Sequence, residues 1–140
     1  MRKLQYAFIL LLFICFLLAG TTAAHLRKKP SEPVLVTQIR ITGHTGTEAL
    51  DRLYIQPEKT GTILNYLRWL TRKGSADPDP EALDNSYFDI TLYYSDGETR
   101  VYRQRGTQYL SKNHRAWEKL DPEQGQYLLP ILRAIPSDDH

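Results

Sequence analysis

Tyrosine and arginine side chains recur along the segment FDITLYYSDGETRVYRQRGTQYL, which runs from Phe88 to Leu110. Both side-chain types combine a large contact area with a polar tip, and both are enriched among the residues that dominate binding energy at protein interfaces. Tyrosine is equally favoured in β-strands, where aromatic side chains pack against their cross-strand neighbours. The segment therefore has two interpretations, a binding surface and an ordinary pair of strands.

The dipeptide Asp96-Gly97 lies between two alternating segments and predicts a β-hairpin with a two-residue turn. In that register Leu92 pairs with Val101. One face is then apolar and belongs to the core, and it comprises Phe88, Ile90, Leu92, Tyr94 and Val101. The other face comprises Asp89, Thr91, Tyr93, Arg100, Tyr102 and Gln104. Because Arg103 falls on the apolar face, its side chain must reach out to solvent or the register must differ.

We expect the polar face of this hairpin to be the partner-binding surface. Its contact residues would be Tyr93, Arg100 and Tyr102, extended by Trp69 or Trp117. The partner would be another envelope or extracellular protein.

Catalytic and cofactor-binding motifs are absent from the sequence. It contains no Gly-x-Ser-x-Gly, no His-Glu-x-x-His, no Cys-x-x-Cys and no phosphate-binding glycine loop. The histidines have no spacing typical of a metal site, although His44 and His114 could still meet in space. We therefore expect no catalytic, cofactor-binding or metal-binding residues, and the alternative is a small envelope enzyme or ligand carrier with a histidine and carboxylate pocket.

The acidic segment GSADPDPEALDNS, from Gly74 to Ser86, alternates carboxylates as calcium loops do. Two prolines stiffen it, and it lacks the turning glycine and closing glutamate of an EF-hand. A solvated connection is the favoured interpretation.

The N-terminus has the pattern of an export signal. Arg2 and Lys3 precede thirteen apolar residues, Ala7 to Ala19. Cleavage near Ala23 or Ala24 would release the protein, whereas the uncharged run from Leu4 to Leu26 is long enough to stay as a membrane anchor. Both alternatives place the remainder outside the cytoplasmic membrane.

Charge and cysteine content agree with an exported domain that does not bind nucleic acid. The chain has 18 basic and 16 acidic residues, and loss of Arg2 and Lys3 would leave 16 of each. A nucleic-acid-binding protein needs a basic surplus to neutralise phosphates. The single cysteine, Cys15, lies in the apolar run, so no disulfide is expected in the exported part.

Apolar periodicity predicts the remaining elements. Strands are expected at 34–41 and 53–55 as a hairpin, and at 107–110 with a continuation at 117–119. A helix should begin at Pro57 and end at Gly74. A second should begin at Pro122, and Pro130 should either kink it or separate its first turn from the next.

The runs YYSDGETRVYRQ, WEKLDPEQ and LPILRAIPSD resemble a group of uncharacterised small exported or membrane-anchored bacterial proteins. These share the YYSDG hairpin and the C-terminal helix. The resemblance covers about the last 55 residues of the chain and implies a similar fold, with no activity or ligand attached.

The sequence as a whole predicts an α+β protein with an antiparallel four- to five-stranded sheet, two helices on one face and the order ββαβββα. The expected organisation is a signal peptide or anchor (1–24), a tether (25–33), a single domain (34–136) and a tail (137–140). The expected function is that of a non-enzymatic extracytoplasmic interaction module, secreted or membrane-anchored.

Overall fold

The first two strands form the hairpin that the sequence predicts. The structure is a computed structural model that describes residues 32–77 and 86–139, of which Val34 onward belong to one compact unit. Strand β1 (Val36–Thr45) pairs antiparallel with β2 (Glu48–Tyr54), and Ile39 lies opposite Tyr54. Both strands are longer than expected, because GHTGTEA contributes to the ladder as well as to the turn.

The second hairpin joins β4 (Ser86–Tyr94) to β5 (Thr99–Arg105), but the predicted register is wrong by one residue. Leu92 pairs with Arg100 instead of Val101. The loop has three residues: the Tyr94 N–H donates to the Glu98 carbonyl at 2.9 Å, and Gly97 takes a left-handed φ of 86°. A shift of one residue moves every side chain of β5 to the opposite face of the sheet.

Six further elements differ from or refine the prediction. Helix α2 (Pro57–Trp69) begins at Pro57 as predicted but ends before Gly74, and the chain continues as β3 (Arg72–Ser75). Strands β6 (Tyr109–Lys112) and β7 (Glu118–Leu120) are separated by a turn in which Asn113 and His114 have positive φ. The C-terminal helix is divided, as the proline at 130 predicts, into α3 (Pro122–Gly125) and α4 (Leu128–Ala134).

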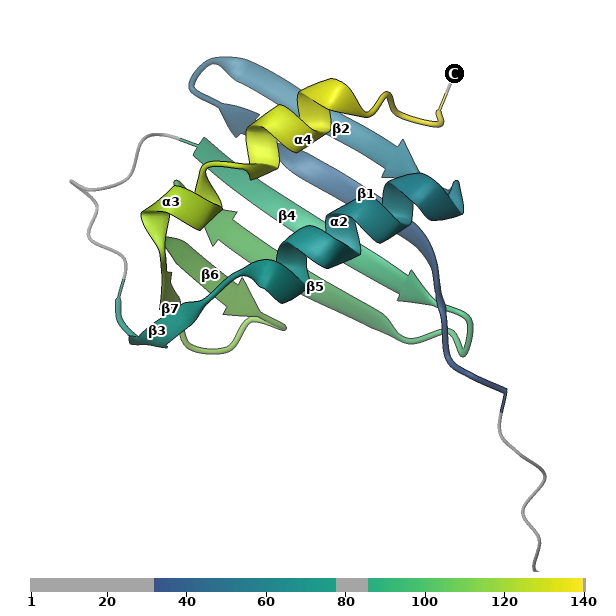
Figure 1. The fold of residues 1–140 in the computed structure, drawn as a ribbon, viewed down its shortest axis with the longest axis horizontal. Helices are drawn as coiled ribbons and strands as arrows, with labels where there is room; N and C mark the ends of the chain where they lie inside the picture. Colours follow the sequence, from purple (N-terminus) through teal and green to yellow (C-terminus); the bar gives the residue numbers. More distant parts are fainter. Residues whose placement is uncertain (1–31, 78–85, 140) are drawn as a thin grey trace, which may run out of the picture. The chain divides into compact units, whose positions relative to one another are not determined.

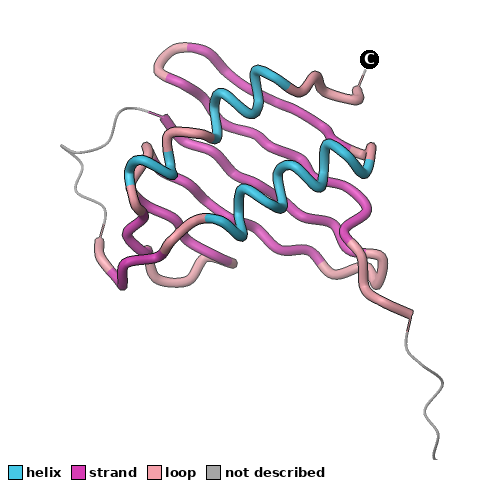
Figure 2. The backbone as a smooth tube through the Cα atoms, viewed as in Figure 1, coloured by secondary structure: helices cyan, strands magenta, loops and turns pink. Residues whose placement is uncertain are grey.

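The described strands form one antiparallel sheet with seven strands in the order β2-β1-β4-β5-β6-β7-β3. The α+β class is confirmed, whereas the expected four or five strands and the order ββαβββα are wrong. Helices α2 and α4 lie over the same face of the sheet (Figures 1 and 2).

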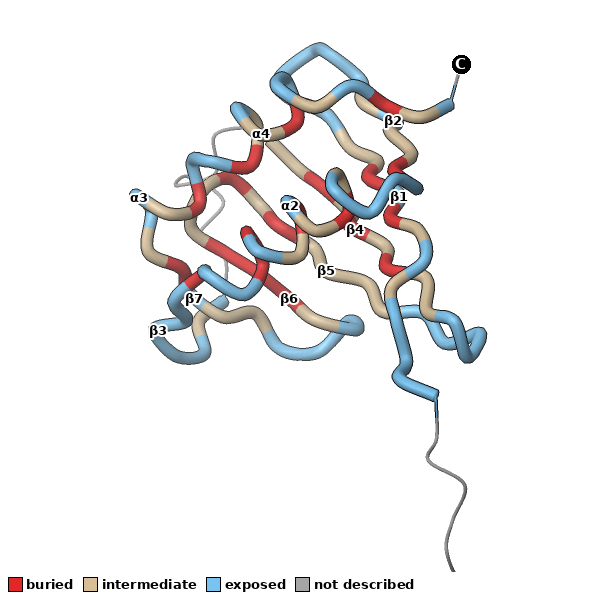
Figure 3. The backbone as a smooth tube through the Cα atoms, turned by 45° about the vertical axis from the view of Figure 1, so that its right-hand side comes forward, coloured by how far each residue is buried: buried red, intermediate tan, exposed pale blue. Residues whose placement is uncertain are grey.

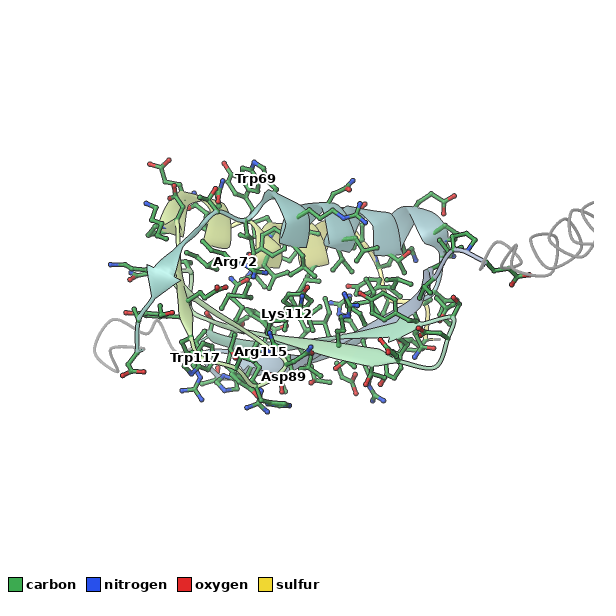
Figure 4. All side chains as sticks on the ribbon, turned by 90° about the horizontal axis from the view of Figure 1, so that it is seen from below. Trp69, Arg72, Asp89, Lys112, Arg115 and Trp117 are labelled. Carbon is green, nitrogen blue, oxygen red and sulfur yellow. The ribbon has the colours of Figure 1, made fainter. Side chains whose placement is uncertain are left out.

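The core lies between this face and the helices. Viewed along the sheet, the helices form one layer and the strands the other (Figure 4), and both layers contain buried positions (Figure 3). The fully buried aliphatic side chains comprise Ile39, Ile41, Ile63, Ile90, Leu92, Leu110, Leu120, Leu128 and Leu132. We call the helix-covered side of the sheet the inner face and the opposite side the outer face.

The C-terminal residues are fixed against β2 and the start of α2. Ser137 is buried, and its hydroxyl accepts from the Leu53 N–H at 2.9 Å. The Asp138 carboxylate accepts from the N–H groups of Ile55 and Gln56 at 2.7 and 3.0 Å and forms an ion pair with Lys59. Of the residues that the sequence assigned to a tail, Ser137 is therefore bonded to β2 and Asp138 holds the start of α2 in place.

These bonds make Asp138 a source of pH-dependent stability. Hydrogen bonds from Ile55, then the Lys59 ammonium and the Gln56 N–H, lower its pKa from 3.8 to about 2. A carboxyl whose pKa is lower in the folded state stabilises the fold above its unfolded pKa, and this contribution is lost as the pH falls from about 4 to about 2.

We expect Asp138→Asn to lower the urea midpoint of unfolding at pH 6 and to have a much smaller effect at pH 2.5. The control is Glu48→Gln, which changes an exposed carboxylate at the start of β2. An equal loss at both pH values for Asp138→Asn would contradict the assignment.

No helix among residues 32–77 and 86–139 is long and apolar enough to cross a membrane. The predicted signal or anchor (1–24) and most of the tether (25–33) lie outside the described residues. So do residues 78–85, the greater part of the acidic connection.

Candidate functional site

The corrected register divides the predicted binding surface between the two faces of the sheet. Tyr93 stays on the outer face, since it lies opposite Thr99 and Gln38. Arg100 and Tyr102 pair with the core residues Leu92 and Ile90 and therefore lie on the inner face. The three residues do not form one surface, and the reason is the extra loop residue between β4 and β5.

The two tryptophans lie in different places. Trp117 precedes β7, and its ring contacts Arg105, whose guanidinium lies 5.2 Å from the ring centroid. Trp69 is 52% exposed at the end of α2 and meets Tyr127 edge to face at 5.5 Å. Figure 4 shows the two tryptophans on opposite sides of the molecule, so only Trp117 can act together with Tyr93.

A row of aromatic and cationic side chains crosses the outer face. The register places His44, Tyr87, Arg105, Tyr109 and Lys119 opposite one another on five adjacent strands. The guanidinium of Arg105 lies 5.7 Å from the Tyr87 ring centroid, and the His44 and Tyr87 rings are 5.9 Å apart. Arg105 is thus held between Tyr87 and Trp117, and we call these three residues the arginine clamp.

The neighbouring row contributes to a half-buried polar network. The Tyr87 hydroxyl donates to Asp89 at 2.6 Å, and the other oxygen of Asp89 lies 3.2 Å from Arg103 Nε. Burial raises the pKa of Tyr87, and the bond to Asp89 raises it further. The phenol therefore remains a protonated donor and fixes the Tyr87 ring beside Arg105.

Among the residues that the structure describes, the charges on the outer face leave a positive surplus near the clamp. Asp89 pairs with Arg103, and Asp51 pairs with Arg40 at 2.7 Å. The hydrogen bond from Arg40 lowers the pKa of Asp51, so this exposed pair is fully charged at neutral pH. Arg105 forms no ion pair with any described residue, and its Nε has no hydrogen-bond partner among them.

The inner face contains a groove of about 710 Å³ beside α2. Its walls come from residues 34–37, from α2 and from the ends of β4 and β5. They include Arg100 and Tyr102 of the predicted surface, and also Arg68 of α2. A second cavity of about 300 Å³ lies near Gly125 and Thr107.

Neither cavity has the composition expected of the alternative function, an enzyme or carrier with a histidine and carboxylate pocket. The residues that line them include no histidine, aspartate or glutamate. His44 lies on the outer face and His114 in the turn after β6. The described part of the chain holds no group of three or more side chains that could bind a metal ion.

Comparisons with known proteins were negative: no protein family, curated protein or solved structure matches the chain. The candidate sites therefore rest on the contacts, burial and charges of the described residues. The resemblance to small exported proteins with a YYSDG hairpin stays an expectation.

Sequence reasoning missed Tyr87, Arg105 and Arg68. The position of Arg103 was the available signal, because a cation on a face assigned to the core indicates a wrong register. With the three-residue loop, Arg103 pairs with Asp89 on the outer face and Arg105 falls beside Tyr87. Arg68 lies in the last turn of α2, where a cation is favourable for the helix itself, so its position gives no signal of a binding site.

Proposed function

We propose that this protein is a non-enzymatic extracytoplasmic interaction module that binds an acidic protein surface through the outer face of its sheet. The observation that carries the proposal is the arginine clamp. Arg105 lies between two aromatic rings, pairs with no described carboxylate, and is oriented by packing before any partner arrives. Export rests on the N-terminal pattern, in which a basic start precedes an apolar run.

The chemistry of the clamp favours a carboxylate-bearing partner. A guanidinium presents paired donors that fit a carboxylate, and its flat faces can stay stacked on the rings while the edge binds. Trp and Tyr beside an Arg are the combination that dominates binding energy in interfaces. Tyr93 extends the same face toward the β4–β5 loop, whereas Arg100 and Tyr102 do not belong to it.

The proposal can be tested by cross-linking in the native envelope. A photoreactive amino acid at Thr91, in the middle of the outer face, is expected to give a defined adduct with an envelope protein. Arg105→Gln should reduce the adduct about tenfold, since a charge-assisted hydrogen bond is lost. Added salt should weaken it as well.

Arg133→Gln is the matched control, because Arg133 is an exposed arginine of α4, whose helix covers the inner face. It should leave the adduct unchanged. An adduct of equal yield in Arg105→Gln, or a Thr91 probe that captures nothing, would overturn the proposal.

A further inference from the structure

The groove beside α2 has a buried apolar floor and an exposed apolar rim. Leu67 and Leu92 are buried at its base. Val34, Leu35 and Ile55 line its rim and are 54%, 61% and 52% exposed. The described residues include five large hydrophobic side chains with such exposure, and three of them lie here, so apolar surface is concentrated at this groove.

The charges of the groove have one sign. Arg68 and Arg100 are its charged lining residues, and no carboxylate lines it. Within the described residues neither arginine takes part in an ion pair. The guanidinium of Arg100 lies over the Tyr94 ring, 4.8 Å from its centroid, which holds the cation at the groove wall.

These features define the ligand by its chemistry. A volume of about 710 Å³ falls within the range of small-molecule sites, roughly 300 to 1,000 Å³. An apolar wall favours a hydrocarbon chain, because each buried methylene adds to the affinity. Two arginines without carboxylate partners favour an anionic head, and a carboxylate matches the paired donors of a guanidinium.

We infer that this groove binds a single-chain anionic amphiphile with a carboxylate head, of the long-chain fatty acid type. The alkyl chain lies against the apolar walls between α2 and strands β4 and β5. The carboxylate lies at Arg68 and Arg100. This site is separate from the arginine clamp, which is on the other face of the sheet, so it does not depend on the proposed function.

The test uses the full chain in phosphatidylcholine vesicles and a photoreactive palmitate analogue, with mass spectrometry of the adducts. We expect labelling within residues 55–68 and 92–102. Excess palmitate should compete with the probe, and hexadecanol, which has the same chain without the charge, should compete at least tenfold more weakly. The double variant Arg68→Gln, Arg100→Gln should reduce labelling about tenfold, and Arg133→Gln should not change it.

A second variant separates loss of binding from loss of folding. Gly61 lines the groove, and a Cβ added there has no heavy atom within 4 Å. Gly61→Leu should therefore fill the groove without a clash and replace a poor helix former with a good one. We expect it to abolish labelling while raising the unfolding temperature.

Three results would overturn the inference. The first is labelling that neither the double arginine variant nor Gly61→Leu reduces. The second is equal competition by palmitate and hexadecanol, which would show that the arginines do not select an anion. The third is labelling confined to residues 1–31, which would mean that the probe enters the apolar N-terminal run.

Discussion

Gly125→Ala is expected to destabilise the folded domain by at least about 3 kcal/mol, because there is no room for a side chain at this position. A Cβ built on Gly125 lies 1.9 Å from the carbonyl oxygen of Thr107. That contact is with backbone, so the clash is relieved only if α3 moves away from the chain before β6. The measurement is urea unfolding of the full chain, followed by tryptophan fluorescence.

The same substitution at Gly61 is the matched control and should have the opposite sign. Gly61 is a helical residue of α2, and a Cβ built on it has no heavy atom within 4 Å outside its own helix backbone. Alanine there should stabilise the fold by about 1 kcal/mol through helix propensity and reduced freedom of the unfolded chain. If Gly125→Ala were neutral, or if both variants shifted stability in the same direction, the close packing of α3 on Thr107 would be wrong.

Gln104→Leu is expected to destabilise the domain by about 3 kcal/mol, since it leaves several buried polar groups without partners. Gln104 is 1% exposed on the inner face. Its side-chain oxygen accepts from the Tyr66 hydroxyl at 2.6 Å, and its nitrogen donates to the carbonyls of Gly106 and Gly125 at 3.0 and 2.9 Å. Leucine has a similar volume but can make none of these bonds.

A double-mutant cycle tests whether the cost comes from the unpaired groups. Tyr66→Phe should cost about 1 to 2 kcal/mol alone, because the Gln104 oxygen then loses its donor. Combined with Gln104→Leu it should cost less than the sum, since the hydroxyl that Gln104→Leu leaves with only the Gly125 carbonyl, at 3.4 Å, is gone. Burial raises the pKa of Tyr66, so the coupling should be constant at neutral and mildly alkaline pH. Additive losses would contradict the pairing.

The elements that the sequence predicted well are those with strong local signals. The helix from Pro57 combines a proline at its first position with an apolar stripe, and Ile63, Tyr66 and Leu67 of that stripe are buried. The first hairpin and the break at the second helix followed in the same way from glycine and proline.

The register of the second hairpin could not be fixed from local sequence. The letters YSDGE fit a two-residue turn, and they also fit a three-residue loop that places Gly97 in the left-handed region. The choice depends on which side chains of β5 the helices cover. Gln104 inside the core is the decisive case, because a buried amide is acceptable there only with Tyr66 and two carbonyls around it.

Strand β3 had no sequence signal at all. All four of its residues, RKGS, are exposed, so there is no alternation of apolar and polar positions. Its strand conformation comes from pairing with β7 and from an ion pair between Arg72 and Glu118 at 3.1 Å. Such an element is determined by tertiary contacts, which local propensity does not contain.

The attachment of the C-terminal residues to β2 also affects how this sheet can meet other chains. Strand β2 is an edge strand. The N–H and C=O groups of a free edge can pair with a strand of another chain, and such pairing can lead to aggregation. At Leu53 both groups are already used, by the Ser137 hydroxyl and by the Asp138 N–H at 2.7 Å. The opposite edge, β3, has only four residues, and such a short edge strand offers few groups for pairing. The C-terminal residues thus reduce the length of β2 that is open to strand pairing, which favours the faces of the sheet as contact surfaces.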